Sequence, residues 1–331
     1  MIIDAEHHLF LEELTAGSFD SGKICERYWK DGRLRIRISR EAANVENHIR
    51  FMDEAGIDMA MLTTNQVKTL DQVKTLDQMK RWNDRCAEVV RKYPKRYVGF
   101  ASVPPTGGKP ALEELERAVK VLGLKGVHIW THDGGANLDS RVMWPFYEKV
   151  SELDIPVDVH ILGEVPGFDA LHAPYALYYV VTREFDMAAS VLRVCLGGVL
   201  EDFPDLKIIM NHFGGGVSSI IERLDAYASY ADRPGWPDFY DGKRLITKPW
   251  REYFNKLYFN MAGREVGMES VKCALTNISP RKLLFATDWP FNFDYEPADV
   301  RRYVAGIRKL ELPQEDIDAM LGGNAARLLG I

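Results

Sequence analysis

The chain of 331 residues contains only four cysteines, and none of them stands in a Cys-x-x-Cys pair. They are scattered along the sequence as Cys25, Cys86, Cys195 and Cys273. Closely spaced cysteines are typical of zinc sites, redox motifs and small disulfide-rich domains, and the sequence gives no sign of these. The scattered pattern predicts reduced thiols in a cytoplasmic protein.

A basic block is also missing, because 42 Lys and Arg stand against 48 Asp and Glu, with a net charge of −6. We therefore expect no nucleic acid and no anionic membrane surface as a partner. The longest apolar runs have the length of a strand, so we expect no transmembrane helix. The N-terminal Met1-Ile2-Ile3-Asp4 becomes acidic at once and predicts no signal peptide. No Gly-x-Gly-x-x-Gly motif follows a candidate strand, which disfavours a dinucleotide site.

The composition that remains is that of a globular protein, 46% hydrophobic and 27% charged. No Pro- or Ser-rich linker and no shift in composition divides the chain. We therefore expect a single domain over residues 1–331. The length permits this, because an α/β barrel needs about 250 residues and tolerates insertions.

Short apolar runs alternate with longer segments of helical spacing. The expected strands are Ile2–Ala5, Asp58–Leu62, Tyr97–Ser102, Gly126–Ile129, Pro156–His160, Leu206–Met210, Leu257–Met261 and Leu283–Ala286. The expected helices are Asn47–Ala55, Met79–Lys92, Ala111–Leu122, Val142–Leu153, Ser190–Phe203, Pro297–Leu310 and Gln314–Leu329. This alternation predicts a parallel α/β fold, for which a (β/α)8 TIM barrel is the best candidate and a doubly wound open sheet the alternative.

Three segments are too long for plain connections, namely Leu9–Ala43, Leu162–Ala189 and Tyr227–Arg251. They predict long insertions after strands 1 and 5 and before strand 7, of the kind that form lids, binding loops or partner contacts. The hexapeptide Gln66–Asp71 recurs at once as Gln72–Asp77. We interpret this repeat as a local duplication that extends a loop or a helix start, without a function of its own.

Several expected strands run directly into polar side chains that can bind a metal ion. These are Glu6-His7-His8 after strand 1, His160 at the end of strand 5, Asn211-His212 after strand 6 and Asp288 after strand 8. In a barrel, parallel strands deliver such groups to one face. Carboxylate and imidazole together suit a divalent transition metal ion with an open position for water or substrate. The glycines Gly214–Gly216 that follow allow a close approach of the backbone.

The side on which these groups lie follows from strand geometry. Alternate residues of a strand share one side, so Glu6 and His8 are expected to point into the barrel and His7 outward. Asp288 stands before Trp289-Pro290, and proline keeps the preceding residue extended. We therefore expect Asp288 on a restrained, extended backbone.

These residues lie within a set of segments that carries a family resemblance. In order along the chain the segments are IDAEHH, MDEAGID, RYVGFASVP, KGVHIWTH, PVDVH, GGVLEDFPDLKIIMNHFGGG, ATDWPF and GNAARLLGI. The sequence resembles the decarboxylase branch of the amidohydrolase superfamily, which includes amino-carboxymuconate-semialdehyde, resorcylate and carboxyvanillate decarboxylases. The resemblance extends over nearly the whole chain.

The resemblance implies a distorted (β/α)8 barrel with one metal ion. The metal-ligand positions of the family fall on Glu6, His8, His160 and Asp288, and its non-ligand active-site histidine falls on His212. The glutamate at the first position resembles the enzymes that decarboxylate hydroxylated benzoates. Because a carboxylate ligand adds hard oxygen, Mn²⁺ becomes as plausible as Zn²⁺.

The resemblance also suggests substrate-binding residues. Lys30 opens a Lys-Asp-Gly tripeptide near the pocket of the family, whereas Ile36 stands where the muconate-semialdehyde enzyme has an arginine. Arg223 and Arg233 match arginines that can reach the site of a neighbouring subunit, which implies a homodimer or homotetramer. Trp130 replaces a smaller residue and predicts a narrower or more aromatic pocket.

Together these features predict a metal-dependent, non-oxidative decarboxylase of a small aromatic, hydroxybenzoate-like or unsaturated carboxylic acid. Asp288 is the candidate proton donor, and His212 would hydrogen-bond the substrate or share the proton. A metal-dependent hydrolase of a lactone, ester or amide is the first alternative, because the same cluster could activate water. Hydration of a double bond and a non-catalytic partner subunit are the others.

Overall fold

The computed structural model describes residues 1–19, 22–64, 76–161, 165, 175–230, 233–235, 240, 243–292 and 296–331, and of residues 263–266 only the backbone. Eight strands form one sheet in the order in which they occur along the chain. They are β1 (Ile3–His8), β4 (Met59–Thr63), β5 (Tyr97–Ser102), β6 (Gly126–Trp130), β9 (Val157–His160), β10 (Ile208–Met210), β11 (Tyr258–Ala262) and β12 (Leu283–Ala286). Each strand pairs in parallel with the next.

The first and last strands meet and nearly close the sheet into a barrel. The backbone N–H of His8 donates to the carbonyl oxygen of Trp289 at 2.9 Å, just beyond β12. The side chain of Asp4 on β1 accepts hydrogen bonds from Thr287. The predicted (β/α)8 barrel is confirmed, and the open sheet is wrong, because a doubly wound sheet reverses its strand order part-way.

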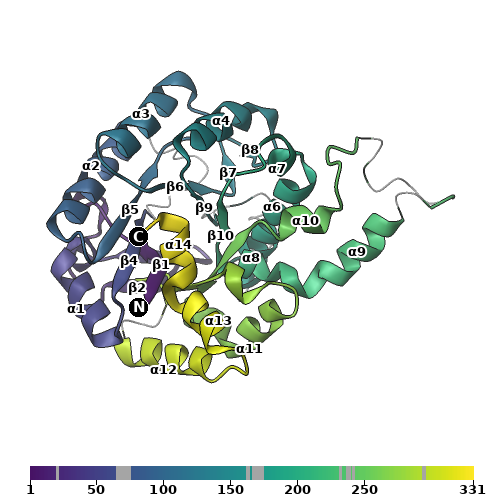
Figure 1. The fold of residues 1–331 in the computed structure, drawn as a ribbon. Coiled ribbons are helices and arrows are strands. Elements are labelled where there is room, and N and C mark those ends of the chain that lie inside the picture. The colour runs from purple at the N-terminus through teal and green to yellow at the C-terminus, as the bar shows by residue number, and fades with distance from the viewer. Residues whose placement is uncertain are drawn as a thin grey trace.

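Helices surround the barrel strands in Figure 1. The α-helices are α1 (Val45–Ala55), α2 (Leu76–Lys92), α3 (Gly108–Lys120), α4 (Trp144–Leu153), α6 (Arg183–Leu196), α7 (Val199–Asp202), α8 (His212–Gly216), α9 (Ile221–Ser229), α10 (Trp250–Phe254), α11 (Gly263–Leu275), α12 (Pro297–Arg308), α13 (Gln314–Asp318) and α14 (Asn324–Leu329). The start of α1 shows how local sequence sets the bounds, since the Asn44 side chain accepts from the backbone N–H of Glu46. The helix ends at Gly56, whose φ of +77° favours glycine.

The inside of the barrel is apolar at its amino-terminal end. Side chains from five of the strands meet there and are covered by α14, and both termini lie at this end (Figure 1). The cluster comprises Ile3, Ala5, Met61, Val98, Phe100, Ile209, Leu284, Ala286, Ala325, Leu328 and Leu329. A second, larger cluster fills the layer between strands and helices. The polar residues are thereby left to the opposite, carboxyl end of the strands.

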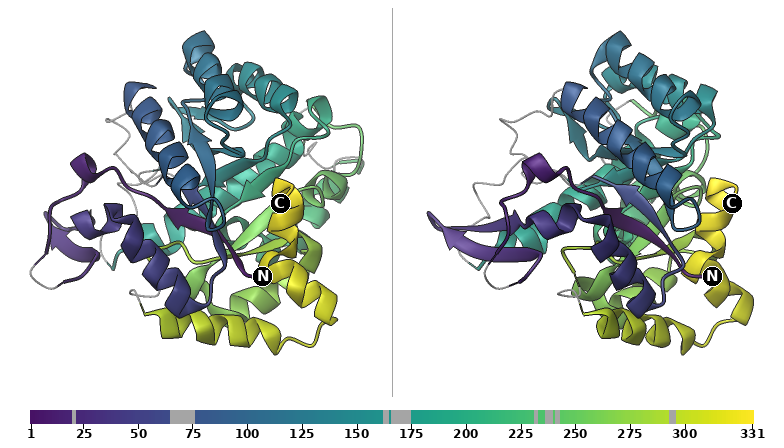
Figure 2. Two further views of the ribbon diagram at one scale, coloured as in Figure 1. Left: turned by 60° about the vertical axis from the view of Figure 1, so that its left-hand side comes forward. Right: turned by 90° about the vertical axis from the view of Figure 1, so that its left-hand side faces the viewer.

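The first long segment contains a β-hairpin that the sequence pattern did not reveal. Strands β2 (Cys25–Lys30) and β3 (Arg33–Ile38) pair antiparallel within residues 9–43. Figure 2 shows this hairpin standing away from the barrel strands. Of the repeated hexapeptides, residues 66–75 lie outside the described residues, and Leu76 and Asp77 begin α2.

The helix expected over Ser190–Phe203 has the wrong bounds. A π-helical turn at Tyr178–Thr182 leads directly into α6, which begins at Arg183. The helix stops at Leu196, and Gly198 with φ of +83° precedes the separate turn α7. Residues 178–189, at the end of the second long segment, are therefore helical, and the early start of α6 places Glu184 and Asp186 beside the polar end of the barrel.

Among the described residues, no helix has both the length and the apolar character that a membrane span requires.

Candidate active site

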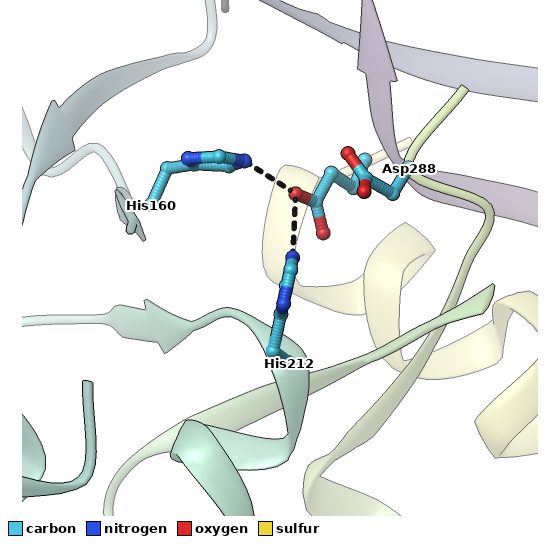
Figure 3. Close-up of side chains that lie close together, drawn as sticks. His160, His212 and Asp288 are labelled. Atoms are coloured by element: carbon cyan, nitrogen blue, oxygen red, sulfur yellow. Dashed lines mark ion pairs between the residues drawn. The ribbon is translucent and has the colours of Figure 1, made fainter. Parts of the chain in front are cut away.

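The carboxyl end of the barrel gathers the polar residues that follow the strands. Glu6 and His8 lie on β1, His160 ends β9, His212 begins α8 after β10, and Asp288 follows β12. All five residues are buried. His160, His212 and Asp288 point toward one another although they come from separate elements (Figure 3). The structure thus brings together residues that the sequence places up to 282 positions apart.

The potential ligand atoms of this cluster lie close enough together to surround one ion. Glu6 Oε1 lies 2.9 Å from His160 Nε2 and 3.6 Å from His212 Nε2. His8 Nε2 lies 2.9 Å from Asp288 Oδ1 and 3.7 Å from Glu6 Oε1. One potential ligand atom from each of Glu6, His160, His212 and Asp288 lies within 4.8 Å of the others. His8 lies beside this group of four.

Three of these atoms are buried without a hydrogen bond among the described residues, namely Glu6 Oε1, His160 Nε2 and His212 Nε2. A buried polar atom that lacks a partner is costly, by about 1–3 kcal/mol. Here the atoms converge from several directions, as the ligands of a metal ion do. The donor set of carboxylate oxygen and imidazole nitrogen therefore fits a divalent transition metal ion.

Neighbouring groups orient two of the imidazoles. His160 Nδ1 lies 2.8 Å from the carbonyl oxygen of Ile161, which can only accept. The proton of His160 must therefore be on Nδ1, and the lone pair on Nε2 faces the cluster. A hydrogen bond of 2.9 Å joins His8 Nδ1 to the hydroxyl of Thr63 on β4.

Asn260 on β11 links the carboxylate of the cluster to the start of α8. Its Nδ2 donates to Glu6 Oε2 at 2.7 Å, and its Oδ1 accepts from the backbone N–H of His212 at 2.9 Å. Glu6 Oε2 is thereby occupied, so Oε1 is the oxygen left for a metal ion. Asn260 is a residue that the sequence analysis missed, and its only signal is an amide within an otherwise apolar strand.

His7 points away from the cluster, as the strand alternation predicts. Its ring stacks on Trp289 at 4.8 Å, and its Nε2 lies 3.1 Å from Nδ1 of His48 on α1. His7 Nδ1 lies 2.9 Å from Asp4 Oδ2. His7 therefore links α1 to the seam of the barrel, where β1 meets the residues that follow β12.

The backbone at two site residues is left-handed. His212 has a φ of +53° and Asp288 a φ of +52°. The expectation of an extended Asp288 is wrong, because proline restricts the residue directly before it, and here that residue is Trp289. The Trp289–Pro290 peptide bond itself is cis. Non-glycine residues in the left-handed region often occur at functional sites.

Charge and burial set the protonation of the cluster. Burial alone would raise the pKa of Glu6, but His212 and His160 outweigh it and hold that pKa well below its usual range. Burial lowers the pKa of His8 to about 3 and also lowers that of His160. Near neutral pH these groups are therefore a carboxylate and neutral imidazoles, the forms that bind metal.

His212 differs from the other two histidines. Burial would lower its pKa, but the carboxylates of Glu184 and Glu6 raise it well above the usual value. Its Nδ1 lies 3.1 Å from Glu184 Oε1. The carboxylate of Glu184 beside His212 thus favours the protonated imidazole, a form suited to proton transfer. His212 nevertheless lies within ligand distance of Glu6, His160 and Asp288. The ligand role of His8 and the non-ligand role of His212 stay predictions.

The family model described as "Amidohydrolase" matches residues 3–331 of the chain. The protein belongs to the amidohydrolase family. Among curated relatives of this amidohydrolase, gamma-resorcylate decarboxylase from Polaromonas sp. strain JS666 is 30% identical over 88% of this chain and 89% of that protein. The 2-amino-3-carboxymuconate-6-semialdehyde decarboxylase of Dictyostelium discoideum is 27% identical over 91% of this chain and 80% of that protein.

A solved structure of dihydroxybenzoic acid decarboxylase from Polaromonas sp. JS666, with bound manganese and the inhibitor 2-nitroresorcinol, has the same fold. It superposes with a TM-score of 0.76 at 25% identity and covers 99% of this chain and 96% of its own. The named relatives are thus decarboxylases that act on aromatic or muconate-type acids. The family resemblance predicted from the sequence is confirmed.

The predicted substrate-binding residues of this amidohydrolase lie in different surroundings. Lys30, Arg223 and Arg233 are exposed. The guanidinium of Arg223 lies over the ring of Tyr227, 5.2 Å from its centroid. Their contact with a substrate stays a prediction.

Trp130 is buried at the end of β6 and lies close to the cluster. Its ring is 5.2 Å from that of His128, and His128 is in turn 5.6 Å from the ring of His160. His128 Nδ1 pairs with Asp158 Oδ2 at 2.6 Å. The aromatic ring of Trp130 is therefore one side chain away from a predicted metal ligand, and its part in a substrate pocket stays a prediction.

Proposed function

We propose that this amidohydrolase is a metal-dependent, non-oxidative decarboxylase of a small, hydroxybenzoate-like carboxylic acid. The observation that carries the proposal is the buried convergence of Glu6, His160, His212 and Asp288, with His8 beside them. Relatives that share most of the chain are named as decarboxylases of such acids, and this supports decarboxylation over hydrolysis.

One divalent metal ion per chain is proposed for the cluster, held by Glu6, His8, His160 and Asp288. The oxygen of Glu6 favours Mn²⁺ as much as Zn²⁺, and the manganese in the Polaromonas structure supports Mn²⁺. When bound, the ion would supply a Lewis acid and a template for the substrate's carboxylate and its neighbouring oxygen.

The chain's own acid and imidazole would carry the proton. Asp288 donates a proton to the ring carbon that bears the carboxylate. The bond from this carbon to the carboxylate then breaks, its electron pair returns to the ring and CO₂ leaves. His212, on the other side of Glu6, would hydrogen-bond the substrate or share the proton.

The functional unit is proposed to be a homodimer or homotetramer of one-domain chains, each comprising residues 1–331. Exposed Arg223 and Arg233 would then reach the site of the neighbouring subunit. A small carboxylic acid is the proposed partner, with no nucleic acid or membrane. Sedimentation that shows a fully active monomer would remove the role across subunits.

The activity is tested by measuring CO₂ release from a panel of hydroxybenzoates, beside hydrolysis of a panel of lactones and esters. In D₂O the product should carry deuterium at the carbon that lost CO₂, and CO₂ should appear in equal amount. Rapid turnover of a lactone or ester while every aromatic acid stays intact would reject the decarboxylase. Deuterium without CO₂ release, from addition of water to a double bond, would indicate a hydratase.

A further inference from the structure

The first turn of α6 lies against α8, the short helix that His212 begins. Glu184 in this turn places Oε1 3.1 Å from His212 Nδ1. His212 is only 5% exposed and the side chain of Glu184 25% exposed, so this contact is largely shielded from water. Twenty-eight positions separate the two residues, and no motif of the sequence connects them.

Gly215 explains how the two helices come so close. A Cβ atom at Gly215 would lie 1.9 Å from the backbone oxygen of Glu184 and 2.8 Å from the backbone nitrogen of Ala188. Both obstacles are backbone atoms of α6, which a side-chain rotation cannot remove. Gly215 also has a φ of +65°, which favours glycine. The absence of a side chain at Gly215 therefore admits α6 and, with it, the carboxylate of Glu184.

The contact fixes which nitrogen of His212 faces the site. An ionised carboxylate only accepts, so the hydrogen bond to Glu184 requires a proton on Nδ1. The other nitrogen, Nε2, is then turned toward Glu6 Oε1 at 3.6 Å. The backbone N–H of His212, held by Asn260, fixes the position from which the ring projects.

The neighbouring carboxylate on the same turn does something different. Asp186 Oδ1 lies 2.7 Å from Nε2 of His132, which follows β6. The start of α6 thus holds two imidazoles from two different strand ends. Only the one held by Glu184 lies within ligand distance of the cluster among the described residues.

We infer that Glu184 is a positioning residue, which accepts the Nδ1 proton of His212 and so presents Nε2 of that imidazole to the substrate. The expected effect of Glu184 on the rate of CO₂ release rests on the proposed decarboxylase function. The structural part of the inference, the tautomer and orientation of His212, stands on the geometry alone.

The test is Glu184→Gln, which keeps the size of the side chain but removes its negative charge and allows the amide to donate to Nδ1 instead of accepting its proton. We expect kcat for CO₂ release to fall by at least about 10- to 100-fold, with little change in KM. Metal content and thermal stability should stay those of the parent protein, because the substitution is isosteric. The matched control is Asp139→Asn, the same acid-to-amide change in a residue that pairs with Arg193 near the other end of α6. It should leave kcat unchanged.

A second readout does not depend on activity. In ¹⁵N NMR of the Zn²⁺-loaded protein, with His212→Asn used to assign the signal, His212 Nδ1 should carry a proton in the parent and lose it in Glu184→Gln. An unprotonated Nδ1 in the parent would overturn the inference. So would a Glu184→Gln variant that keeps its kcat, or one that loses metal in step with rate. If the parent releases no CO₂ from any acid, the proposed function fails while the NMR result still decides the role of Glu184.

Discussion

Asp288 is the residue at which metal binding and proton transfer would meet. Its Oδ1 contacts His8 at 2.9 Å, and Asn292 donates to its Oδ2 at 3.3 Å. The left-handed backbone at Asp288 turns the chain immediately after β12, so the carboxylate stays at the mouth of the barrel. A carboxylate in such a place can ligate an ion with one oxygen and handle a proton with the other.

For Asp288→Asn we expect a loss of chemistry that exceeds the loss of metal. Glu6, His8 and His160 still offer three ligands, whereas removal of a positioned acid costs about 10²–10⁴-fold in rate. Elemental analysis and kcat measured on the same preparation check this. Equal loss of metal and activity would mean that Asp288 acts as a ligand only.

The variant His212→Asn tests whether catalysis can be lost while metal binding is kept. If His212 is not a ligand, the variant should keep its metal ion and lose about 10²–10⁴-fold in kcat. Metal content and CO₂ release are again the measurements. A variant that binds no metal would instead place His212 among the ligands, as its 3.6 Å distance to Glu6 permits.

At the scale of elements, the seam between β1 and β12 places the two parts of the cluster relative to each other. Asp4 Oδ1 accepts from the backbone N–H of Thr287 at 2.8 Å, and its Oδ2 accepts from the Thr287 hydroxyl at 2.5 Å. The backbone N–H of Glu6 also donates to Asp4 Oδ1, at 3.2 Å. Asp4 thus connects the residue before Asp288 to the strand that carries Glu6.

Asp4→Asn should therefore lower both stability and metal affinity. An amide in this place puts a donor where two donors already converge, at a cost of about 1–3 kcal/mol in the free energy of unfolding. Urea unfolding and metal titration measure the two effects. The control is Asp58→Asn, since Asp58 accepts from the backbone N–H of Ile2 at the other end of β1, at 2.6 Å. It should leave metal affinity unchanged, and equal metal affinities in all three proteins would refute the role of the seam.

At the scale of the whole molecule, the metal ion is expected to be part of the folded protein. Removal of the ion leaves buried Glu6, His160 and His212 atoms without partners. Because the ion binds only the folded chain, stabilisation should grow with its free concentration, by about 2.7 kcal/mol at 100 times its Kd.

Chelation should accordingly lower the Tm, and Mn²⁺ or Zn²⁺ should restore it, as scanning calorimetry would show. Mg²⁺ is the control, because it prefers an octahedral set of oxygen ligands. Protein purified with no metal and a Tm that no divalent ion changes would contradict the metal site.

The stability of the fold should also depend on pH through His48, which lies buried between α1 and the barrel seam. Its Nε2 donates to the carbonyl oxygen of Ala42 at 2.8 Å. Burial and the neighbouring His7 lower its pKa well below the usual 6.5. The unfolded chain therefore binds a proton at His48 below about pH 6.5, where the folded chain does not.

Acidification below pH 6.5 should consequently reduce the free energy of unfolding, with a slope from His48 of up to about 1.4 kcal/mol per pH unit. Urea unfolding between pH 5 and 8 measures the slope. In His48→Gln the amide can still donate to Ala42 but does not titrate, so the slope should be smaller. An identical slope in both proteins would show that His48 does not contribute.

The sequence by itself determined the strands, the barrel and the kinds of residue in its site. All eight expected strands exist, because each is a short apolar run whose period is local. Their ends agree with the expected ones to within two residues, except that β1 runs on to His8. The position of Glu6, His160 and Asp288 at one end follows from the common direction of parallel strands. The hairpin β2–β3 was missed although Arg and apolar residues alternate along β3, and none of its residues is fully buried.

Only the tertiary structure decided which atoms face one another. Glu184, Asn260 and Asp4 form hydrogen bonds with residues that lie 28, 254 and 283 positions away, and such contacts leave no periodic signal in a sequence. The start of α6 at Arg183 was missed because the π-helical turn before it disturbs the spacing of apolar residues. Backbone direction at Asp288 likewise depends on the turn that the barrel requires after β12. Strand periodicity is a property of neighbours along the chain, whereas the geometry of the site is a property of neighbours in space.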